Sequence, residues 1–362
     1  MKIQAGAMAN PAAAQEISER EISEKERSEM KKTITVFRGD GIGPEITDSV
    51  LKVLEAAGAP LEYEMFNVGQ KEWETNGKLI PDEAYASFEK NRVLLKAPIT
   101  TPVGFGFRSL NVTLRTKYDL YANIRPVRSN SAVKTRFENV DVVIFRENTE
   151  GMYIGKENMV DEDTAEAIRL TTRKATRRII RAAFDYAVKN NRRKVTCVHK
   201  ANILKMTEGM ILSEFREIAK EYPQIEADDR IVDATCMQLV IDPTKFDVMV
   251  MENLFGDILS DLCSGLIGGL GLVPSSNIGD DYAMFEAVHG SAPDIAGKHL
   301  ANPTAFLWSA CLMLEYLGEK ECAAKIRRAV DDVLAEGKHL TGDLHGTAST
   351  DEYIEAVIAA LK

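Results

Sequence analysis

The chain has 362 residues, of which 45% are hydrophobic and 28% charged, so it can build two domains or one large α/β unit. Its formal net charge of −10 argues against a nucleic-acid-binding protein, because phosphate neutralisation needs a basic surface. The five cysteines have no Cys-x-x-Cys spacing and no apolar run approaches the roughly 20 residues that span a bilayer, so disulfide scaffolds, zinc knuckles and membrane spans are not expected.

Residues 1–30 differ from the rest in composition: an Ala-rich start is followed by a run of Glu, Ser and basic residues. The stretch lacks the apolar core of a secretory signal, and its many glutamates fit a mitochondrial presequence poorly. We therefore expect a solvated, disordered tail and a cytoplasmic protein. The mitochondrial matrix is the less favoured alternative, for a eukaryotic source.

From residue 33 onward, short β-rich runs alternate with helical stretches, which predicts an α/β fold. The pattern predicts strands at 33–37, 93–98, 141–145, 194–200 and 246–253. It predicts helices from the GDGIGPEI segment to about 57, at 109–118, over a long amphipathic stretch at 163–189, and at 303–317, 319–336 and 351–361. Because no Pro/Gly/Ser linker divides the chain, two domains would have to be interleaved.

The segment Gly39–Glu45 reads GDGIGPE and joins the first predicted strand to the first predicted helix. That context suggests a dinucleotide-binding loop, but the spacing is not GxGxxG, so a Rossmann fold is not expected. Pro44 suits the first turn of a helix, and the glycines permit a sharp turn. A purely structural turn is an equally good interpretation.

Three arginines lie where α/β proteins build their sites, at helix starts and strand ends. Arg115 follows Ser109 and Asn111 near the start of a predicted helix. Arg125 is expected in the next strand, and Arg146 at the end of another. Together they could bind a substrate with several carboxylates, because guanidinium groups pair with carboxylates bidentately. The alternative is that each forms an ordinary surface salt bridge.

Asp257 and Asp261 are four residues apart in a predicted helix, so both carboxylates share one face. Like charges at this spacing repel, which points to a compensating Mg²⁺ or Mn²⁺ ion. The alternative is two helix acids stabilised by the macrodipole. Asp233, at another predicted strand end, could be a third ligand or a helix cap.

Two further segments are candidates for chemistry. Lys200 ends a predicted strand among apolar residues, where a lysine can transfer protons, although a surface lysine is the ordinary alternative. Residues 286–297 form a loop of small and polar residues that could approach a nucleotide. In that loop Asp294 could accept hydrogen bonds from a ribose and repel a 2′-phosphate, although a plain surface loop is the alternative.

Taken together, the segments GDGIGPE, KYDLYANIRPV, RENTEGMY, HKANI, NLFGDILSD and HGSAPDIAGK resemble, in order and spacing, the β-decarboxylating dehydrogenases. This family includes the isocitrate, isopropylmalate, homoisocitrate and tartrate dehydrogenases, and the likeness runs from Lys32 to the C-terminus. It implies a non-Rossmann α/β fold with a large domain from 31–120 and 267–362. A smaller domain, 121–266, would carry a clasp and the dimer interface.

The resemblance also implies roles for individual residues. Ser109 and Asn111 favour isocitrate over the apolar isopropylmalate, and Asp294 with Ile295 favours NAD over NADP. Lys200 and Asp233 would serve the active site of a partner protomer, giving a homodimer or a higher homo-oligomer with shared sites. The remaining implied contacts are Tyr153 and Lys200 as catalytic residues; Ser109, Asn111, Arg115, Arg125 and Arg146 on the substrate; Asp233, Asp257 and Asp261 on Mg²⁺ or Mn²⁺; and Thr100, Glu286, His289, Gly290, Ser291, Ala292, Pro293, Asp294, Ile295 and Asn302 on NAD.

The implied reaction is oxidative decarboxylation of isocitrate to 2-oxoglutarate and CO₂, with no nucleic-acid or membrane partner. Two alternatives remain open. The chain could be a homoisocitrate or isopropylmalate dehydrogenase, or it could be a regulatory subunit of a hetero-oligomeric isocitrate dehydrogenase. The presence of every implied site residue argues against a catalytically silent subunit.

Overall fold

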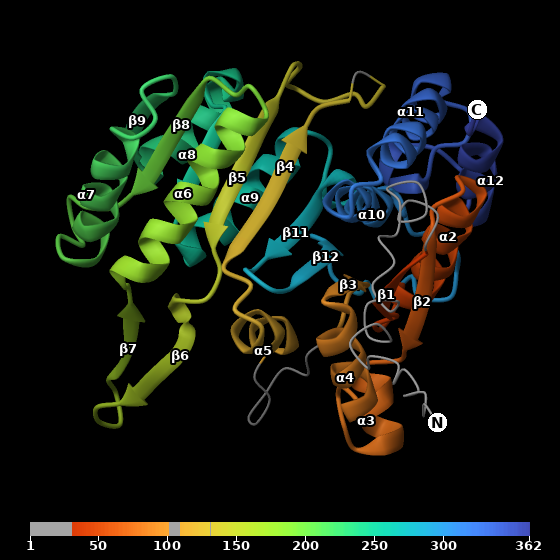
Figure 1. Cartoon of the computed structure of the whole chain (residues 1–362), viewed down its shortest axis with the longest axis horizontal. Coiled ribbons are helices and arrows are strands. Elements are labelled where there is room, and N and C mark those ends of the chain that lie inside the picture. The colour runs from red at the N-terminus through yellow and green to blue at the C-terminus, as the bar shows by residue number, and fades with distance from the viewer. Residues whose placement is uncertain (1–30, 101–108, 131) are drawn as a thin grey trace, which may run out of the picture.

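The computed structural model describes residues 31–100, 109–130 and 132–362. Within these ranges the chain forms one ten-stranded sheet with helices on both faces, and a separate two-stranded hairpin (Figure 1). The prediction of an α/β fold is confirmed. The expected tail at 1–30 lies outside the described residues.

The five predicted strands are all present, with small differences at their ends. The sheet strands are β1 (Lys32–Phe37), β2 (Leu61–Phe66), β3 (Val93–Lys96), β4 (Ala122–Arg128), β5 (Asp141–Glu147), β8 (Lys194–His199), β9 (Glu226–Ile231), β10 (Val248–Met251), β11 (Pro274–Ile278) and β12 (Ala283–Ala287). The hairpin consists of β6 (Gly151–Met159) and β7 (Ala165–Leu170).

The predicted helices are also present, except in one region. The α-helices are α2 (Gly43–Ala56), α3 (Gln70–Asn76), α4 (Asp82–Asn91), α5 (Leu110–Lys117), α6 (Arg173–Lys189), α7 (Thr207–Ala219), α8 (Val232–Ile241), α9 (Asn253–Leu266), α10 (Thr304–Tyr316), α11 (Lys320–Glu336) and α12 (Thr350–Ala360). None of the helices in the described ranges combines the length and apolarity needed to cross a bilayer.

The prediction of one long helix over 163–189 is wrong in its first third. Residues 165–170 form β7, which pairs with β6, and α6 begins only at Arg173. Thr172 sets this start: its backbone is extended, and its hydroxyl accepts a hydrogen bond from the backbone N–H of Ala175. Most of β7 is exposed, and its sequence AEAIRL lacks the strict alternation of apolar and polar residues that would indicate a strand buried on one face.

The strand order, β2-β1-β3-β12-β11-β4-β5-β10-β8-β9, divides the sheet by sequence. One half draws its strands from 32–96 and 274–287, and the other from 122–251. The halves join where β11 and β4 pair antiparallel. Hairpin β6–β7 extends away from the second half (Figure 1). The domain division at 120 and 267, with β6–β7 as the clasp, stays a prediction.

Apolar side chains bury both faces of the sheet. In the second half, α6 and α7 pack on one face and bury Ile180, Phe184 and Phe215 against β5, β8 and β10. On the opposite face α9 buries Leu259 and Cys263 in a core that continues under α10, α11 and α12. The sheet is therefore held rigidly, and the ends of its strands can position polar side chains accurately.

Candidate active site

Arg115, Arg125 and Arg146 come together in the folded chain. Arg125 on β4 and Arg146 on β5 belong to neighbouring antiparallel strands, and Arg115 lies on α5. Their exposed fractions are only 7%, 5% and 1%. They are therefore not the surface salt bridges of the alternative interpretation. Burial and the charges of Arg146 and Arg115 lower the pKa of Arg125 to about 9, which reflects how closely the cations are gathered.

This arginine cluster keeps unused hydrogen-bonding capacity. Arg146 donates from Nε to Asn253 Oδ1 at 2.9 Å. The Nε atoms of Arg115 and Arg125, in contrast, are buried without a hydrogen-bond partner among the described residues. Buried donors of this kind are costly when they stay unpaired. The cluster is therefore suited to an anionic ligand with more than one carboxylate.

Asp257 and Asp261 lie on one face of α9, as their spacing predicts, and this face is turned toward the arginine cluster. Arg146 and Tyr153 both donate to the carboxylate of Asp257. Arg125 Nη1 lies 3.6 Å from Asp261 Oδ1 and 3.9 Å from Asp257 Oδ1. Neither acid is in the first turn of α9, which Glu252 caps, so the macrodipole does not explain the pair.

The two acids differ in their electrostatics. Burial would raise the pKa of Asp257, but the charge of Arg146 and the hydrogen bond from Tyr153 hold it below its usual value. Burial raises the pKa of Asp261 above its usual value. Gly256, between them and the sheet, allows the close approach: a Cβ there would lie 2.5 Å from Cβ and Cγ of Arg146.

The acids fit a divalent metal in part. Asp257 and Asp261 offer hard oxygen ligands on one helix face. Asp233, at the start of α8, forms an ion pair with Lys200 instead. Across the described residues, no group of three potential metal-ligating side chains gathers in one place. A single chain therefore offers two of the three predicted carboxylates at one site, and the third would have to come from elsewhere.

Ser109 and Asn111 stand at the start of α5, on the same helix as Arg115. Ser109 is the N-cap residue, yet its side chain makes no capping hydrogen bond. Asn111 Oδ1 is buried without a hydrogen-bond partner among the described residues. Both side chains are therefore available to a polar group of a ligand beside the arginine cluster.

Tyr153 and Lys200 are the predicted proton-transfer groups. Burial and the hydrogen bond to Asp257 raise the pKa of Tyr153 to about 12, so the phenol keeps its proton at neutral pH. Lys200 follows β8, and its backbone N–H donates to Glu208 at 2.9 Å. The hydrogen bond from Lys200 lowers the pKa of Asp233. Lys200 therefore contacts Asp233 and not the arginine cluster of its own chain.

Three segments far apart in sequence meet beside β12. The backbone N–H of Ile42 donates to Ser291 O at 2.9 Å, and Thr100 and Ser291 share a hydroxyl hydrogen bond of 2.7 Å. Asp40 accepts from the backbone N–H of Thr100 at 2.9 Å. Gly41 has φ +59° and faces Ser291 O so closely that no Cβ would fit. The GDGIGPE turn thus packs against the predicted cofactor loop at Ser291.

The loop predicted at 286–297 begins only after β12, which includes Glu286 and Ala287, so the cofactor loop is residues 288–297. It leaves several groups exposed to a ligand. Its backbone turns sharply at Ala292, which has φ +41°, and Gly290, Pro293 and Asp294 are exposed. His289 Nε2 is buried without a hydrogen-bond partner among the described residues, and burial lowers the pKa of this histidine. A neutral imidazole with a free nitrogen and an exposed carboxylate fit a nucleotide.

Glu286 and Asn302 have partners within the chain. Glu286 is 5% exposed and accepts from Arg115 at 3.0 Å, while Lys96 Nζ lies 2.7 Å from its other oxygen. These cations outweigh burial and hold the pKa of Glu286 at about 2. Asn302 accepts from the backbone N–H of Thr304 and donates to Asp343. Their direct contacts with NAD stay predictions.

Lys96 was missed in the sequence analysis, although a lysine within the apolar run VLLK is an unusual feature. It is 1% exposed and forms a buried ion pair with Glu286, which also accepts from Arg115. The pair links β3 and β12, which are neighbours in the sheet, to the arginine cluster.

Comparisons with known proteins agree with this geometry. The family model for isocitrate/isopropylmalate dehydrogenase matches residues 33–357. The chain is 46% identical, over 98% of its length and 91% of the relative, to the alpha chain of a probable mitochondrial isocitrate dehydrogenase [NAD] of Drosophila melanogaster. It is 50% identical, over 90% of each chain, to a regulatory subunit of the mitochondrial isocitrate dehydrogenase [NAD] of Dictyostelium discoideum. The crystal structure of isocitrate dehydrogenase from Methylococcus capsulatus superimposes with a TM-score of 0.88 at 51% identity, covering 91% of this chain and 99% of that one.

Proposed function

The chain belongs to the isocitrate/isopropylmalate dehydrogenase family, and from this we propose that it oxidatively decarboxylates isocitrate to 2-oxoglutarate and CO₂ with NAD and a divalent metal. The observation that carries the proposal is the buried arginine cluster facing Asp257 and Asp261, with unpaired donors. Isocitrate has three carboxylates and a hydroxyl, so it needs several cations and a metal to bind. The relatives named above agree with this substrate and cofactor.

Each part of the substrate has candidate ligands in the site. Arg115, Arg125 and Arg146 bind carboxylates through their guanidinium groups. Ser109 and Asn111, at the start of α5, would donate from the hydroxyl and from the side-chain amide N–H₂ to the carboxylate that isopropylmalate lacks, whereas an isopropyl group would leave these polar side chains unpaired. This distinction favours isocitrate over the apolar substrate of the same family.

The protein side of the mechanism uses two proton carriers. Lys200, supplied by the second copy, would help to remove the proton of the C2 hydroxyl during oxidation at C2, for which NAD would be the hydride acceptor. Tyr153, which keeps its proton at neutral pH, donates it to C3 after CO₂ has left. Asp257 and Asp261 would hold a divalent metal, whose positive charge would stabilise negative charge on the C2 oxygen.

The choice of NAD follows from the cofactor loop. Asp294 is exposed and would accept hydrogen bonds from the ribose hydroxyls. The same carboxylate would repel the 2′-phosphate of NADP. Lys298, the residue after the loop, donates to the backbone oxygen of Asp294 at 2.8 Å and so is occupied locally.

The active site is completed in a dimer. Lys200 and Asp233 lie together but apart from Asp257 and Asp261, so a second copy would supply them. Between residues 159 and 241, the segment that carries Lys200 and Asp233, several large apolar side chains are exposed. They are Met159, Val160 and Ile168 on the hairpin, Ile203 and Met206 after β8, and Met237 and Ile241 on α8. Many exposed apolar side chains in one region are typical of a protein interface.

Met237→Asp is expected to convert the dimer to a monomer and to abolish most of the turnover, because a carboxylate would be buried in the apolar interface. Light scattering after size exclusion, together with turnover, measures both effects. Met65→Asp on the edge strand β2 is the matched control, since Met65 is 52% and Met237 53% exposed. A Met237→Asp protein that stays dimeric would contradict the proposed interface.

Steady-state turnover of the purified chain alone, with isocitrate, Mg²⁺ and either NAD or NADP, tests the function. We expect strong preference for NAD, and little turnover of homoisocitrate or isopropylmalate. Preference for NADP would overturn the role of Asp294. A chain that turns over only with a second, different subunit would support the regulatory alternative, which the Dictyostelium relative keeps relevant.

For the compartment, we retain the cytoplasm, where the five free cysteines would stay reduced. The Drosophila and Dictyostelium relatives are mitochondrial by name, and the matrix is reducing too. Recovery of the protein in a mitochondrial fraction would therefore overturn the cytoplasmic proposal without affecting the reaction.

A further inference from the structure

Arg169 connects two buried carboxylates that belong to different helices. It lies near the end of β7, at the base of the hairpin, and it is 12% exposed at the side chain. It forms an ion pair with Glu208 of α7, and its Nη2 lies 3.4 Å from Oε2 of Glu252. The side chains of Glu208 and Glu252 are 0% and 6% exposed. Three desolvated charges in one place are costly, so this group calls for an explanation.

The second carboxylate oxygen of Glu208 accepts a hydrogen bond from the backbone of Lys200, the proposed proton-transfer residue. Oε2 of Glu208 accepts the backbone N–H of Lys200 at 2.9 Å, while Oε1 faces Arg169. The turn that carries Lys200 is therefore fixed to α7 by a carboxylate. Arg169 holds the orientation of that carboxylate.

Glu252 caps the helix that carries the proposed metal ligands. Its carboxylate accepts the backbone N–H groups of Leu254 at 3.1 Å and Phe255 at 2.8 Å, at the start of α9. The guanidinium of Arg169 also lies over the ring of Phe255, 5.1 Å from its centroid. Asp257 follows two residues later. Arg169 thus contacts the two residues, Glu252 and Phe255, that form the start of α9.

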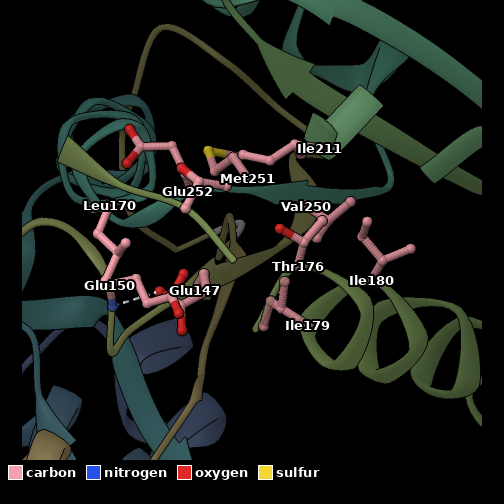
Figure 2. A pocket seen from close by; sticks show the side chains of 12 residues that line it. Glu147, Glu150, Leu170, Thr176, Ile179, Ile180, Ile211, Val250, Met251 and Glu252 are labelled. Atoms are coloured by element: carbon pink, nitrogen blue, oxygen red, sulfur yellow. Dashed lines mark hydrogen bonds between the residues drawn. The ribbon is translucent and has the colours of Figure 1, made fainter. Parts of the chain in front are cut away.

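The same three elements meet around a small pocket beneath the hairpin. Leu170 of β7, Ile211 of α7 and Glu252 line this pocket together with Ile179 and Ile180 of α6, and Figure 2 shows Leu170 and Glu252 on one side of it and the three isoleucines on the other. The pocket lining is largely apolar, which lowers the local dielectric and strengthens the neighbouring ion pairs. The base of the hairpin therefore packs against α7, which carries Glu208, and against Glu252.

We propose that Arg169 is a positioning residue that holds the Lys200 turn and the first turn of α9 in register through Glu208 and Glu252. This inference rests on the proposed function, which makes Lys200 and Asp257 catalytic. In the proposed dimer, Asp257 serves the active site of its own chain and Lys200 serves that of the partner. One guanidinium then links the two active sites through the base of the hairpin.

Hydrogen–deuterium exchange of the full-length protein, without substrate, tests the link directly. In Arg169→Gln we expect the amides in peptides 199–206 and 252–257 to exchange on the order of tenfold faster, because local opening there becomes easier. Arg169→Lys keeps the charge but offers a single nitrogen, so it should give intermediate protection at one peptide or both. It also serves as the informative variant if the glutamine variant does not fold.

Steady-state kinetics then test the consequence for the reaction. Arg169→Gln should lower kcat by about 10–100-fold, as is usual when the support of a metal or catalytic group is lost. The KM for NAD should stay within about twofold of the wild type, because the cofactor loop is not touched. A purely structural role would lower the amount of folded protein without separating kcat from the KM for NAD.

Arg177→Gln is the matched control. Arg177 on α6 also pairs with a buried glutamate, Glu214, but contacts neither catalytic element. It should leave exchange at both peptides and kcat unchanged. If Arg169→Gln matches this control in exchange, the inference is overturned. If exchange rises as expected but the wild type does not turn over isocitrate, the mechanical link stands and the proposed function fails.

Discussion

Asp257→Asn is expected to lower kcat by about 1,000-fold, equivalent to about 4 kcal/mol of transition-state stabilisation, which is the scale of a lost metal contact. Asp257 accepts hydrogen bonds from both Arg146 and Tyr153. An asparagine has one acceptor oxygen, so its amide N–H₂ would face one of these donors. The variant also leaves the buried cations of Arg146 and Arg125 with less compensating charge. Turnover at saturating Mg²⁺, isocitrate and NAD measures the effect.

A second aspartate provides a matched control for this experiment. Asp185 on α6 also accepts a hydrogen bond from a tyrosine, Tyr222, at 2.7 Å, but it is exposed and far from the site in the fold. Asp185→Asn should therefore leave kcat within about twofold of the wild type. Isothermal titration with Mn²⁺ should show weaker binding only for Asp257→Asn. Turnover above about a tenth of the wild-type value in Asp257→Asn would contradict its role as a metal ligand.

Glu286→Gln is expected to lower the free energy of unfolding by about 3–5 kcal/mol, because removal of one partner leaves a buried charge uncompensated. Glu286 faces Lys96, Arg115 and Asn277, and Lys96 is 1% exposed. A glutamine can still accept one hydrogen bond, but it cannot neutralise the ammonium of Lys96. Urea unfolding at neutral pH measures the loss.

The same comparison should depend on pH in a defined direction. Lys96 and Arg115 hold the folded pKa of Glu286 at about 2, below the value of about 4.3 for an unfolded glutamate. The stabilisation is therefore fully present above about pH 4.3 and is lost as the pH falls toward 2. The difference in unfolding free energy between the wild type and Glu286→Gln should shrink over that interval. A difference that grows on acidification would contradict the ion pair.

An exposed ion pair controls for the removal of a glutamate charge as such. Glu315 accepts from Arg327 at 3.1 Å, with both side chains more than a third exposed. Glu315→Gln should cost less than about 1 kcal/mol, because solvent screens surface pairs. Similar losses in the two variants would show that burial does not strengthen the Glu286 pair.

The sequence predicted the parts of the fold that carry strong local signals. The buried strand at 33–37 and the C-terminal helices have clear hydrophobic periodicity, and they form as predicted. The strand at 165–170 was missed because it is largely exposed, so it carries no pattern of burial, and within the described residues it is held by pairing with β6 in a hairpin. Propensity in that region favours a helix, and pairing across the hairpin overrides it.

The candidate site was predictable to the extent that residue type alone suggests chemistry. The spacing of Asp257 and Asp261 predicted a shared helix face, and the structure places both acids toward Arg125. In contrast, nothing in the neighbourhood of Lys96 or Arg169 reveals partners that lie 190 or 39 positions away. Such buried ion pairs are set by the pairing of strands and the packing of helices. They can be found only once the fold is known.

Gly256 places a constraint on how this protein can vary. Any side chain at this position would meet Cβ and Cγ of Arg146 at 2.5 Å, and these atoms are too close to the backbone to move aside. With the backbone in place, relief would require glycine at 146, because even alanine keeps the Cβ, and this change would remove a buried cation from the arginine cluster. A substitution of Gly256 alone is therefore not expected to be tolerated. The two positions can change only together, and only along a route that gives up the present substrate.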